Sequence, residues 1–316
     1  MSPGAGIRDP VFVLGAPRSA TTLLFHTLAR SSGLWSLGME SQAVFEGPYH
    51  PSLLGWRSNA LGAEDLTPEN GERIRAGFLR RVQPGPVWRR RDARREKRPG
   101  SRGPAARIAY AAARARAAAI RRFGTVRLLE KTPDNCLRVP FLRALFPDAK
   151  FLFLRRDGRN NVSALIDGWR LEGQFESYDL PVPVGIPGYA GRRWCFHLPP
   201  GWRGLTTEPL EVVCAEQWKS CMEAVLAELP SLRAAGAVCE LSYEELTRAP
   251  RTTLTRVLGF LGLPVEDAVV PREDRLPVVN ARTPPDPEKW RKTNGPAIER
   301  ILPRIAGVQA ALGYPA

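Results

Sequence analysis

The hydrophobic pattern of this chain alternates between short apolar runs and longer segments in which apolar residues recur at helical spacing. The short runs predict strands at residues 10–15, 126–130, 150–155 and 237–242. The longer segments predict helices at 20–32, 136–146, 158–170, 209–229, 250–261 and 296–312, the last kinked at Pro303. This alternation indicates an α/β fold, with a central parallel β-sheet flanked by helices on both faces.

Polar and turn-forming residues interrupt the alternation in several places. Residues 33–70 and 264–287 are rich in glycine, proline or serine, so we expect loops there. Segments of low apolar content at 68–82 and 104–123 are expected to be helical. Residues 172–208 predict a lid-like loop segment, because proline and glycine are mixed there with aromatic residues. These aromatic residues are Phe175, Tyr178, Tyr189, Trp194, Phe196 and Trp202.

At 316 residues the chain could hold one large α/β domain or two small ones, and we expect a single domain over residues 1–316. Its apolar content of 43% is enough for a real core. We find no run of about 18 apolar residues, and we expect no membrane span. The polar stretch at 2–10 is unlike a secretory signal. The five cysteines are scattered and lack a C-x-x-C pair, so we expect reduced thiols in the cytoplasm and no metal site.

The net charge of +14 is concentrated in one segment. Residues 88–122 carry thirteen Lys and Arg residues against Asp92 and Glu96, which leaves only +3 on the rest of the chain. We therefore expect a basic helical insertion at about 84–123. It is either a solvated surface or a patch for nucleic acid, an acidic carrier or a membrane surface. We expect no specific nucleic-acid partner, because no recognisable reading fold is present.

Candidate chemistry begins where the first predicted strand ends. Residues 11–24 read VFVLGAPRSATTLL, which predicts a strand, a tight loop and a helix that together form an anion site. Aligned on G-x-x-x-x-G-K-[ST] from Gly15, the second glycine is Ala20 and the lysine is Thr21, while Arg18 supplies a cation. The loop therefore suits an anion but lacks the lysine of metal-assisted triphosphate chemistry. A positive φ at Ala20 would cost about 1 kcal/mol or more.

Two further strands end in charged turns. The sequence LLEKTPDN at 128–135 places Lys131 at one strand end, and KFLFLRRDGRNNVS at 150–163 places Arg156 at the other. Carboxyl ends of parallel strands share one edge of a sheet, where ligands bind. We therefore expect these cations to converge with the first loop on one polyanionic ligand.

These motifs resemble the sulfotransferase family, whose members take a sulfuryl group from 3′-phosphoadenosine 5′-phosphosulfate (PAPS). The loop PRSATT at 17–22 is similar to the family's P-R-S-G-T-T, KTP at 131–133 to K-[TD]-P, and RDGR at 156–159 to R-D-x-R. Three later stretches also resemble family motifs: ELSYEEL at 240–246, LGFLGLP at 258–264 and KWRK at 289–292. The matches occur in the expected order, from residue 11 to about 292.

The resemblance implies a PAPS-dependent sulfotransferase that releases 3′,5′-ADP and needs no metal. The residues expected at the 5′-phosphosulfate are Pro17, Arg18, Ser19, Ala20, Thr21 and Thr22. Lys131 would bind the bridging or sulfuryl oxygen and stabilise the leaving group. Arg156 and Ser163 would hold the 3′-phosphate; Ser163 follows Arg156 by seven residues where the family has eight, which leaves the register open. Tyr243 and Lys292 are further expected contacts of the cofactor.

The acceptor hydroxyl needs a base. Glu40 follows the first predicted helix at about the distance where tyrosine-sulfating members carry a catalytic glutamate, so Glu40 is our choice. His50 and His197 are the alternatives, and His26 is expected to be structural. The aromatic residues of 172–208 either line a pocket for a bulky acceptor or pack that segment onto the body.

The leading hypothesis is sulfuryl transfer to a hydroxyl of a small molecule that resembles a secondary metabolite. A metal-dependent small-molecule kinase is the second reading, disfavoured by the missing loop lysine. A non-catalytic basic module that binds nucleotides or nucleic acid through residues 88–122 is the third. The sequence identifies neither the acceptor nor the oligomeric state.

Overall fold

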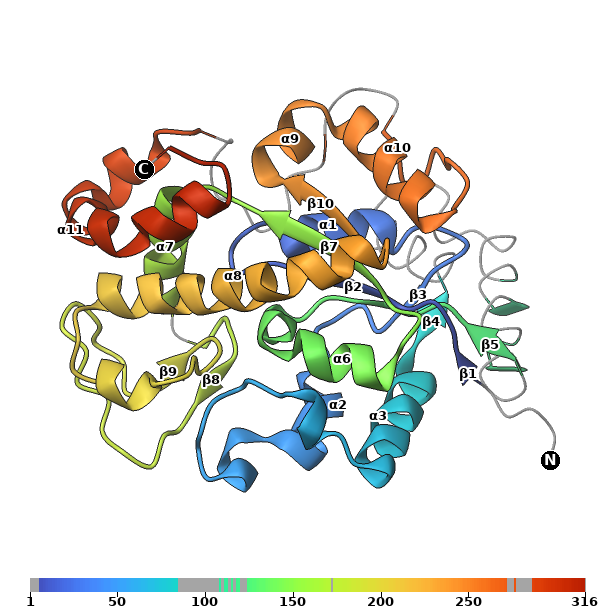
Figure 1. Cartoon of the computed structure of the whole chain (residues 1–316), viewed down its shortest axis with the longest axis horizontal. Coiled ribbons are helices and arrows are strands. Elements are labelled where there is room, and N and C mark those ends of the chain that lie inside the picture. Colours follow the sequence, from blue (N-terminus) through green and yellow to red (C-terminus); the bar gives the residue numbers. More distant parts are fainter. Residues whose placement is uncertain are drawn as a thin grey trace.

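The computed structural model describes residues 6–84, 124–171, 173–271 and 286–315, together with Leu276 and isolated positions between 108 and 119. Its central sheet has four parallel strands (Figure 1), in the order β10 (Val238–Ser242), β7 (Lys150–Arg155), β2 (Val11–Leu14) and β6 (Leu129–Glu130). All four carboxyl ends therefore meet at one edge, as the sequence predicts.

Alternation along the strands distributes the apolar side chains between two cores. Phe12 pairs with Phe151 in the sheet, and both lie in the larger core. Their neighbours Val13 and Leu152 point to the opposite face and join the smaller core. Helices cover both faces, which confirms the predicted α/β class: in Figure 1, α8 (Leu210–Ala234) crosses in front of the sheet and α1 (Thr21–Leu28) lies behind it.

The remaining helices surround this sheet. They are α2 (Gln42–Tyr49), α3 (Pro68–Arg81), α6 (Val139–Leu145), α7 (Gly158–Trp169), α9 (Tyr243–Arg248), α10 (Pro250–Leu261) and α11 (Lys289–Ala311), with short 3₁₀ helices η1 (Pro51–Leu54), η2 (Ala63–Asp65), η3 (Pro133–Arg138) and η4 (Trp202–Leu205). Three two-stranded pairs complete the described part: β1 (Gly6–Ile7) with β5 (Thr125–Val126), β3 (Trp35–Ser36) with β4 (Gln83–Pro84), and β8 (Ser177–Tyr178) with β9 (Trp194–Cys195).

Several expected boundaries were wrong. The first helix ends at Leu28 instead of residue 32, and α2 lies inside the segment predicted as loop. The last helix begins at Lys289, and its break is at Asn294, where φ is −133°, instead of at Pro303. Pro296 explains this position, because a proline two residues later removes a helical N–H donor, and the Asn294 side chain bonds to α7 instead.

The predicted lid-like segment is anchored by its aromatic side chains. Trp194 is buried between Trp169, at 5.3 Å between ring centroids, and Trp202, at 6.1 Å. Only Phe175 and Phe196 among its aromatic residues lie in the wall of the main cavity. Most of these aromatic residues thus pack the segment onto the body, the second of the two readings.

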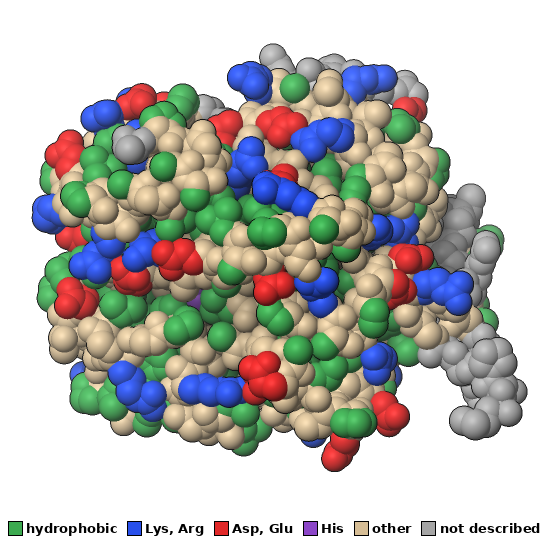
Figure 2. All heavy atoms as spheres, in the orientation of Figure 1, with side chains coloured by type: hydrophobic (Ala, Val, Ile, Leu, Met, Phe, Trp, Pro, Cys, Tyr) green, Lys and Arg blue, Asp and Glu red, His purple; other side chains and the backbone are tan. Residues whose placement is uncertain are grey.

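Most of the predicted basic insertion lies outside the described residues. On the face in Figure 2, Lys and Arg side chains are interspersed with Asp and Glu and form no single-sign patch. All five cysteines are buried without a disulfide, as expected of apolar fillers. Within the described ranges, no helix combines the length and apolar character needed to cross a bilayer.

Candidate active site

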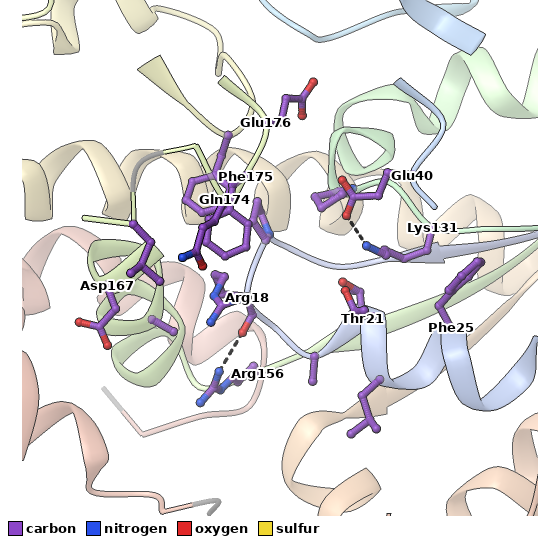
Figure 3. Close-up of a pocket in the computed structure, with 18 of the residues that line it drawn as sticks. Arg18, Thr21, Phe25, Glu40, Lys131, Arg156, Asp167, Gln174, Phe175 and Glu176 are labelled. Atoms are coloured by element: carbon purple, nitrogen blue, oxygen red, sulfur yellow. Dashed lines mark hydrogen bonds and ion pairs between the residues drawn. The ribbon is translucent and has the colours of Figure 1, made fainter. Parts of the chain in front are cut away.

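The four strand ends open into a cavity of about 1240 Å³. Its wall brings together most residues predicted from the motifs (Figure 3): Pro17, Arg18, Ala20, Thr21, Thr22, Glu40, Lys131, Arg156, Ser163 and Tyr243. Arg18 and Arg156 lie on one side of the cavity, and Glu40 with Lys131 on the other. Ser19 and Lys292 are absent from this wall.

The loop after β2 has the backbone of an anion-binding turn. Arg18 and Ala20 are left-handed, with φ of 68° and 74°, immediately before the N-terminus of α1. Ser19 is buried and donates its Oγ hydrogen bond to the Ala16 carbonyl at 2.7 Å, so it shapes the loop from inside. Gly15 has no room for a side chain, because a Cβ there would lie 2.7 Å from the Leu154 carbonyl oxygen.

The left-handed conformation of Ala20 leads to a prediction about the free energy of unfolding. We expect Ala20→Gly to raise the free energy of unfolding by about 0.5–1 kcal/mol, because glycine removes a Cβ penalty larger than its own entropic cost. Ala224→Gly, within the regular helix α8, is the matched control and should lower it by a similar amount. Urea denaturation measures both; a destabilised Ala20→Gly protein would contradict the assignment.

Arg156 is fixed beside the loop with bonding capacity left over. Its Nη1 donates to the Arg18 carbonyl at 2.8 Å, and its guanidinium lies 4.5 Å from the centroid of the Tyr243 ring. Burial lowers the pKa of this guanidinium, yet arginine stays charged. Its solvent-shielded Nε has no hydrogen-bond partner among the described residues. This orphaned donor fits an anionic ligand such as a phosphate.

Of the neighbouring motif residues, Ser163 lines the cavity, whereas Asp157 stabilises the start of α7. Ser163 lies in the cavity wall, with its Oγ 2.9 Å from Asn294 Nδ2 and 3.1 Å from Thr293 Oγ1. Asp157 caps α7 by accepting from the Arg159 N–H. Its carboxylate also pairs with the Arg159 side chain, and this contact lowers the pKa of Asp157.

The late basic motif presents a different lysine from the one we chose. Lys292 is exposed and pairs with Asp286 at 2.7 Å, outside the cavity wall. Lys289, three residues earlier, lies in that wall. The sequence prediction began this helix only at residue 296, after the motif, so the helical phase of the motif could not be assigned.

Glu40 and Lys131 form a direct ion pair on the other side of the cavity. Lys131 is buried, whereas the Glu40 side chain keeps about a third of its surface exposed, 33%. Behind them, buried Glu130 accepts hydrogen bonds from Ser41 Oγ at 2.7 Å and Thr132 Oγ1 at 2.6 Å. These hydrogen bonds hold in place Ser41 and Thr132, the residues that follow Glu40 and Lys131 in the chain.

Glu130 also makes stability depend on pH. Burial raises its pKa from 4.5 to about 7. Between these values the folded state binds more protons than the unfolded state, so stability falls as pH rises from 4.5 to 7. The loss from this group is about 3 kcal/mol. We expect the melting temperature of Glu130→Gln to vary less with pH over this range than that of the wild type. An equal dependence on pH in both proteins would reject the assignment of this effect to Glu130.

The histidines are poorly placed to act as the base. His50 lies outside the cavity wall, with Nδ1 at 2.6 Å from Ser52 Oγ. His197 lies in the wall but is fully buried, and burial lowers its pKa to about 4. His26, expected to be structural, also contributes to the wall.

Sequence reasoning missed a polar network beside the proposed base. Gln42 Nε2 donates to Glu40 Oε2 at 2.7 Å and to Glu176 Oε2 at 3.1 Å, and Asp134 lies nearby in the same wall. A glutamate within a loop segment carries no periodic or motif signal. The network is visible only in the structure, where Gln42 and Glu176, 134 residues apart in the chain, come into contact.

Comparison with known proteins gives a family match over most of the chain. The model described as "Sulfotransferase family" matches residues 10–179 and 193–267. An uncharacterised protein of Aquifex aeolicus is 23% identical over 264 residues, which are 83% of this chain and 26% of that protein. A putative protein-tyrosine sulfotransferase of Caenorhabditis elegans is 25% identical over 150 residues, 48% of this chain and 45% of that protein.

Solved structures are similar at low identity. The sulfotransferase domain from the curacin biosynthetic pathway is 15% identical with a TM-score of 0.47, and the alignment covers 97% of this chain and 98% of that one. A sulfotransferase of Alicyclobacillus acidocaldarius is 13% identical with a TM-score of 0.48, covering 98% and 97% of the two chains.

Proposed function

Because the chain belongs to the sulfotransferase family, we propose that it moves a sulfuryl group from PAPS to a hydroxyl of a small, secondary-metabolite-like acceptor. The observation that carries this proposal is the orphaned donor of Arg156 at one end of a cavity whose other end holds Glu40 against Lys131. One end suits a phosphate, and the other suits proton removal beside a cation.

Each residue has a task in this proposal. When bound, PAPS supplies the sulfuryl group. Arg18, Thr21 and the loop amides would hold its 5′-phosphosulfate at the N-terminus of α1. Arg156 with Ser163 would hold its 3′-phosphate.

The opposite side of the cavity serves the acceptor. Lys131 would stabilise negative charge next to the transferred group. Glu40 Oε1 or Oε2 would accept the proton of the acceptor hydroxyl, because both oxygens face groups of the cavity wall.

Calorimetric titration tests the proposal directly. With EDTA present, 3′,5′-ADP is expected to bind, because the proposed contacts are cations, hydroxyls and amides of the protein. ATP with Mg²⁺ is titrated in parallel. Binding of ATP with Mg²⁺ alone would overturn the proposal in favour of the kinase.

A further inference from the structure

Glu176 lies in the cavity wall without a cationic partner. It precedes β8, and its two carboxylate oxygens accept from Tyr178 Oη at 2.5 Å and Gln42 Nε2 at 3.1 Å. No Lys, Arg or His of the described ranges forms an ion pair with it. Glu176 is half-buried in the wall of the cavity, and a carboxylate without a cation at such a place suits a cationic group of a ligand.

Other carboxylates in the cavity wall add to the negative charge around Glu176. Glu40, Glu46, Asp134 and Glu176 all line this part of the cavity. Lys131 pairs with Glu40, and Arg138 pairs with Asp134 at 3.2 Å. Glu46 and Glu176 have no such partner among the described residues, so two of these four carboxylates are not ion-paired there.

The hydrogen bonds around Glu176 suit its ionised form. Asn59 Nδ2 donates to Tyr178 Oη at 3.0 Å, which directs the tyrosine proton to Glu176. Both oxygens of Glu176 therefore accept. Burial and the nearby Asp134 carboxylate nevertheless raise the pKa of Glu176 well above its usual range. A cation in the cavity would remove this conflict.

In the same wall, the imidazole of His197 has a ring nitrogen that receives no hydrogen bond from the described part of the chain. His197 is fully buried and follows Phe196, whose N–H donates to the Glu176 carbonyl at 2.9 Å. His197 Nε2 contacts the Gln217 carbonyl at 3.1 Å, so Nε2 carries the proton and Nδ1 is an acceptor. Nδ1 has no partner among the described residues.

We propose that the acceptor is a cationic amino alcohol whose ammonium group pairs with Glu176 while its hydroxyl faces Glu40. This inference rests on the proposed sulfotransferase function and names its substrate class. Gln42 Nε2 donates to both carboxylates and so bridges them. The amine should therefore lie two or three carbon atoms from the hydroxyl.

Matched pairs of alcohols test this inference in calorimetric titrations of the protein saturated with 3′,5′-ADP. The pairs are 2-amino-1-phenylethanol with 1-phenyl-1-propanol, 2-amino-1-butanol with 2-methyl-1-butanol, and 3-amino-1-propanol with 1-butanol. In each pair a methyl group replaces the ammonium. For at least one pair, the amine should bind at least tenfold more tightly than its partner.

Glu176→Gln should abolish this preference without changing the affinity for 3′,5′-ADP. Asp179→Asn, three residues away on the exposed surface, should keep the preference. Absence of any preference in the wild type, or its persistence in Glu176→Gln, overturns the inference. The preference of the wild type for the amine tests the inference even if Glu176→Gln does not fold. Normal 3′,5′-ADP binding in the same samples separates this failure from failure of the proposed function.

Discussion

Replacing Glu40 by glutamine is expected to lower kcat by about two to four orders of magnitude, while 3′,5′-ADP binds with unchanged affinity. Glutamine keeps the size of the side chain and its contact with Gln42, but it cannot take a proton. The lost ion pair leaves the buried Lys131 without its carboxylate partner, so thermal melting is measured beside kcat to show that the variant is folded. Transfer of labelled sulfate from PAPS measures kcat, and calorimetry measures binding.

Glu46→Gln is the matched control for this experiment. Glu46 lies in α2, six residues after Glu40, and lines the same cavity, but it forms no ion pair with Lys131. The kcat of Glu46→Gln should stay within about threefold of the wild-type value. Unchanged turnover in Glu40→Gln would remove Glu40 as the base and promote His197, because His50 lies outside the cavity wall.

Arg156→Ala should weaken the binding of 3′,5′-ADP by about 10- to 150-fold, the range for a lost hydrogen bond to a charged group. The guanidinium has both a fixed position, from Arg18 and Tyr243, and an unused donor. Arg156→Lys should recover only part of the affinity, because an ammonium cannot reproduce the planar fork.

Arg155→Ala separates a specific contact from a general loss of positive charge. Arg155 precedes Arg156, but its side chain pairs with Glu240 at 3.4 Å and does not line the cavity. This variant should bind 3′,5′-ADP like the wild type. The opposite ranking of the two variants would assign the phosphate contact to Arg155 and shift the register by one residue.

The sequence predicts the sheet, and it brings Arg18, Lys131 and Arg156 to one cavity, because both features depend on local patterns. Apolar runs that end in a glycine loop, in Lys131 or in Arg156 place those residues at strand ends. The parallel fold then brings the strand ends together. Left-handed Ala20 follows from the same local constraint.

Features that depend on distant contacts were not predictable in this way. The break at Asn294 combines Pro296 with hydrogen bonds to α7, more than 120 residues away in the chain. The wall around Glu176 needs segments near residues 40, 134 and 176 to meet. Apolar periodicity reports which face of an element is buried, but not which polar groups from other elements will face it.

The hydrogen bond from Arg156 to the Arg18 carbonyl has a consequence for nucleotide discrimination. One side chain belongs both to the expected 3′-phosphate site and to the scaffold of the 5′-phosphosulfate loop. A nucleotide without the 3′-phosphate would leave the Arg156 Nε unsatisfied and would make no contact with the guanidinium that also bonds to the loop. Selection against abundant adenine nucleotides would then act on the geometry of the loop as well as on affinity.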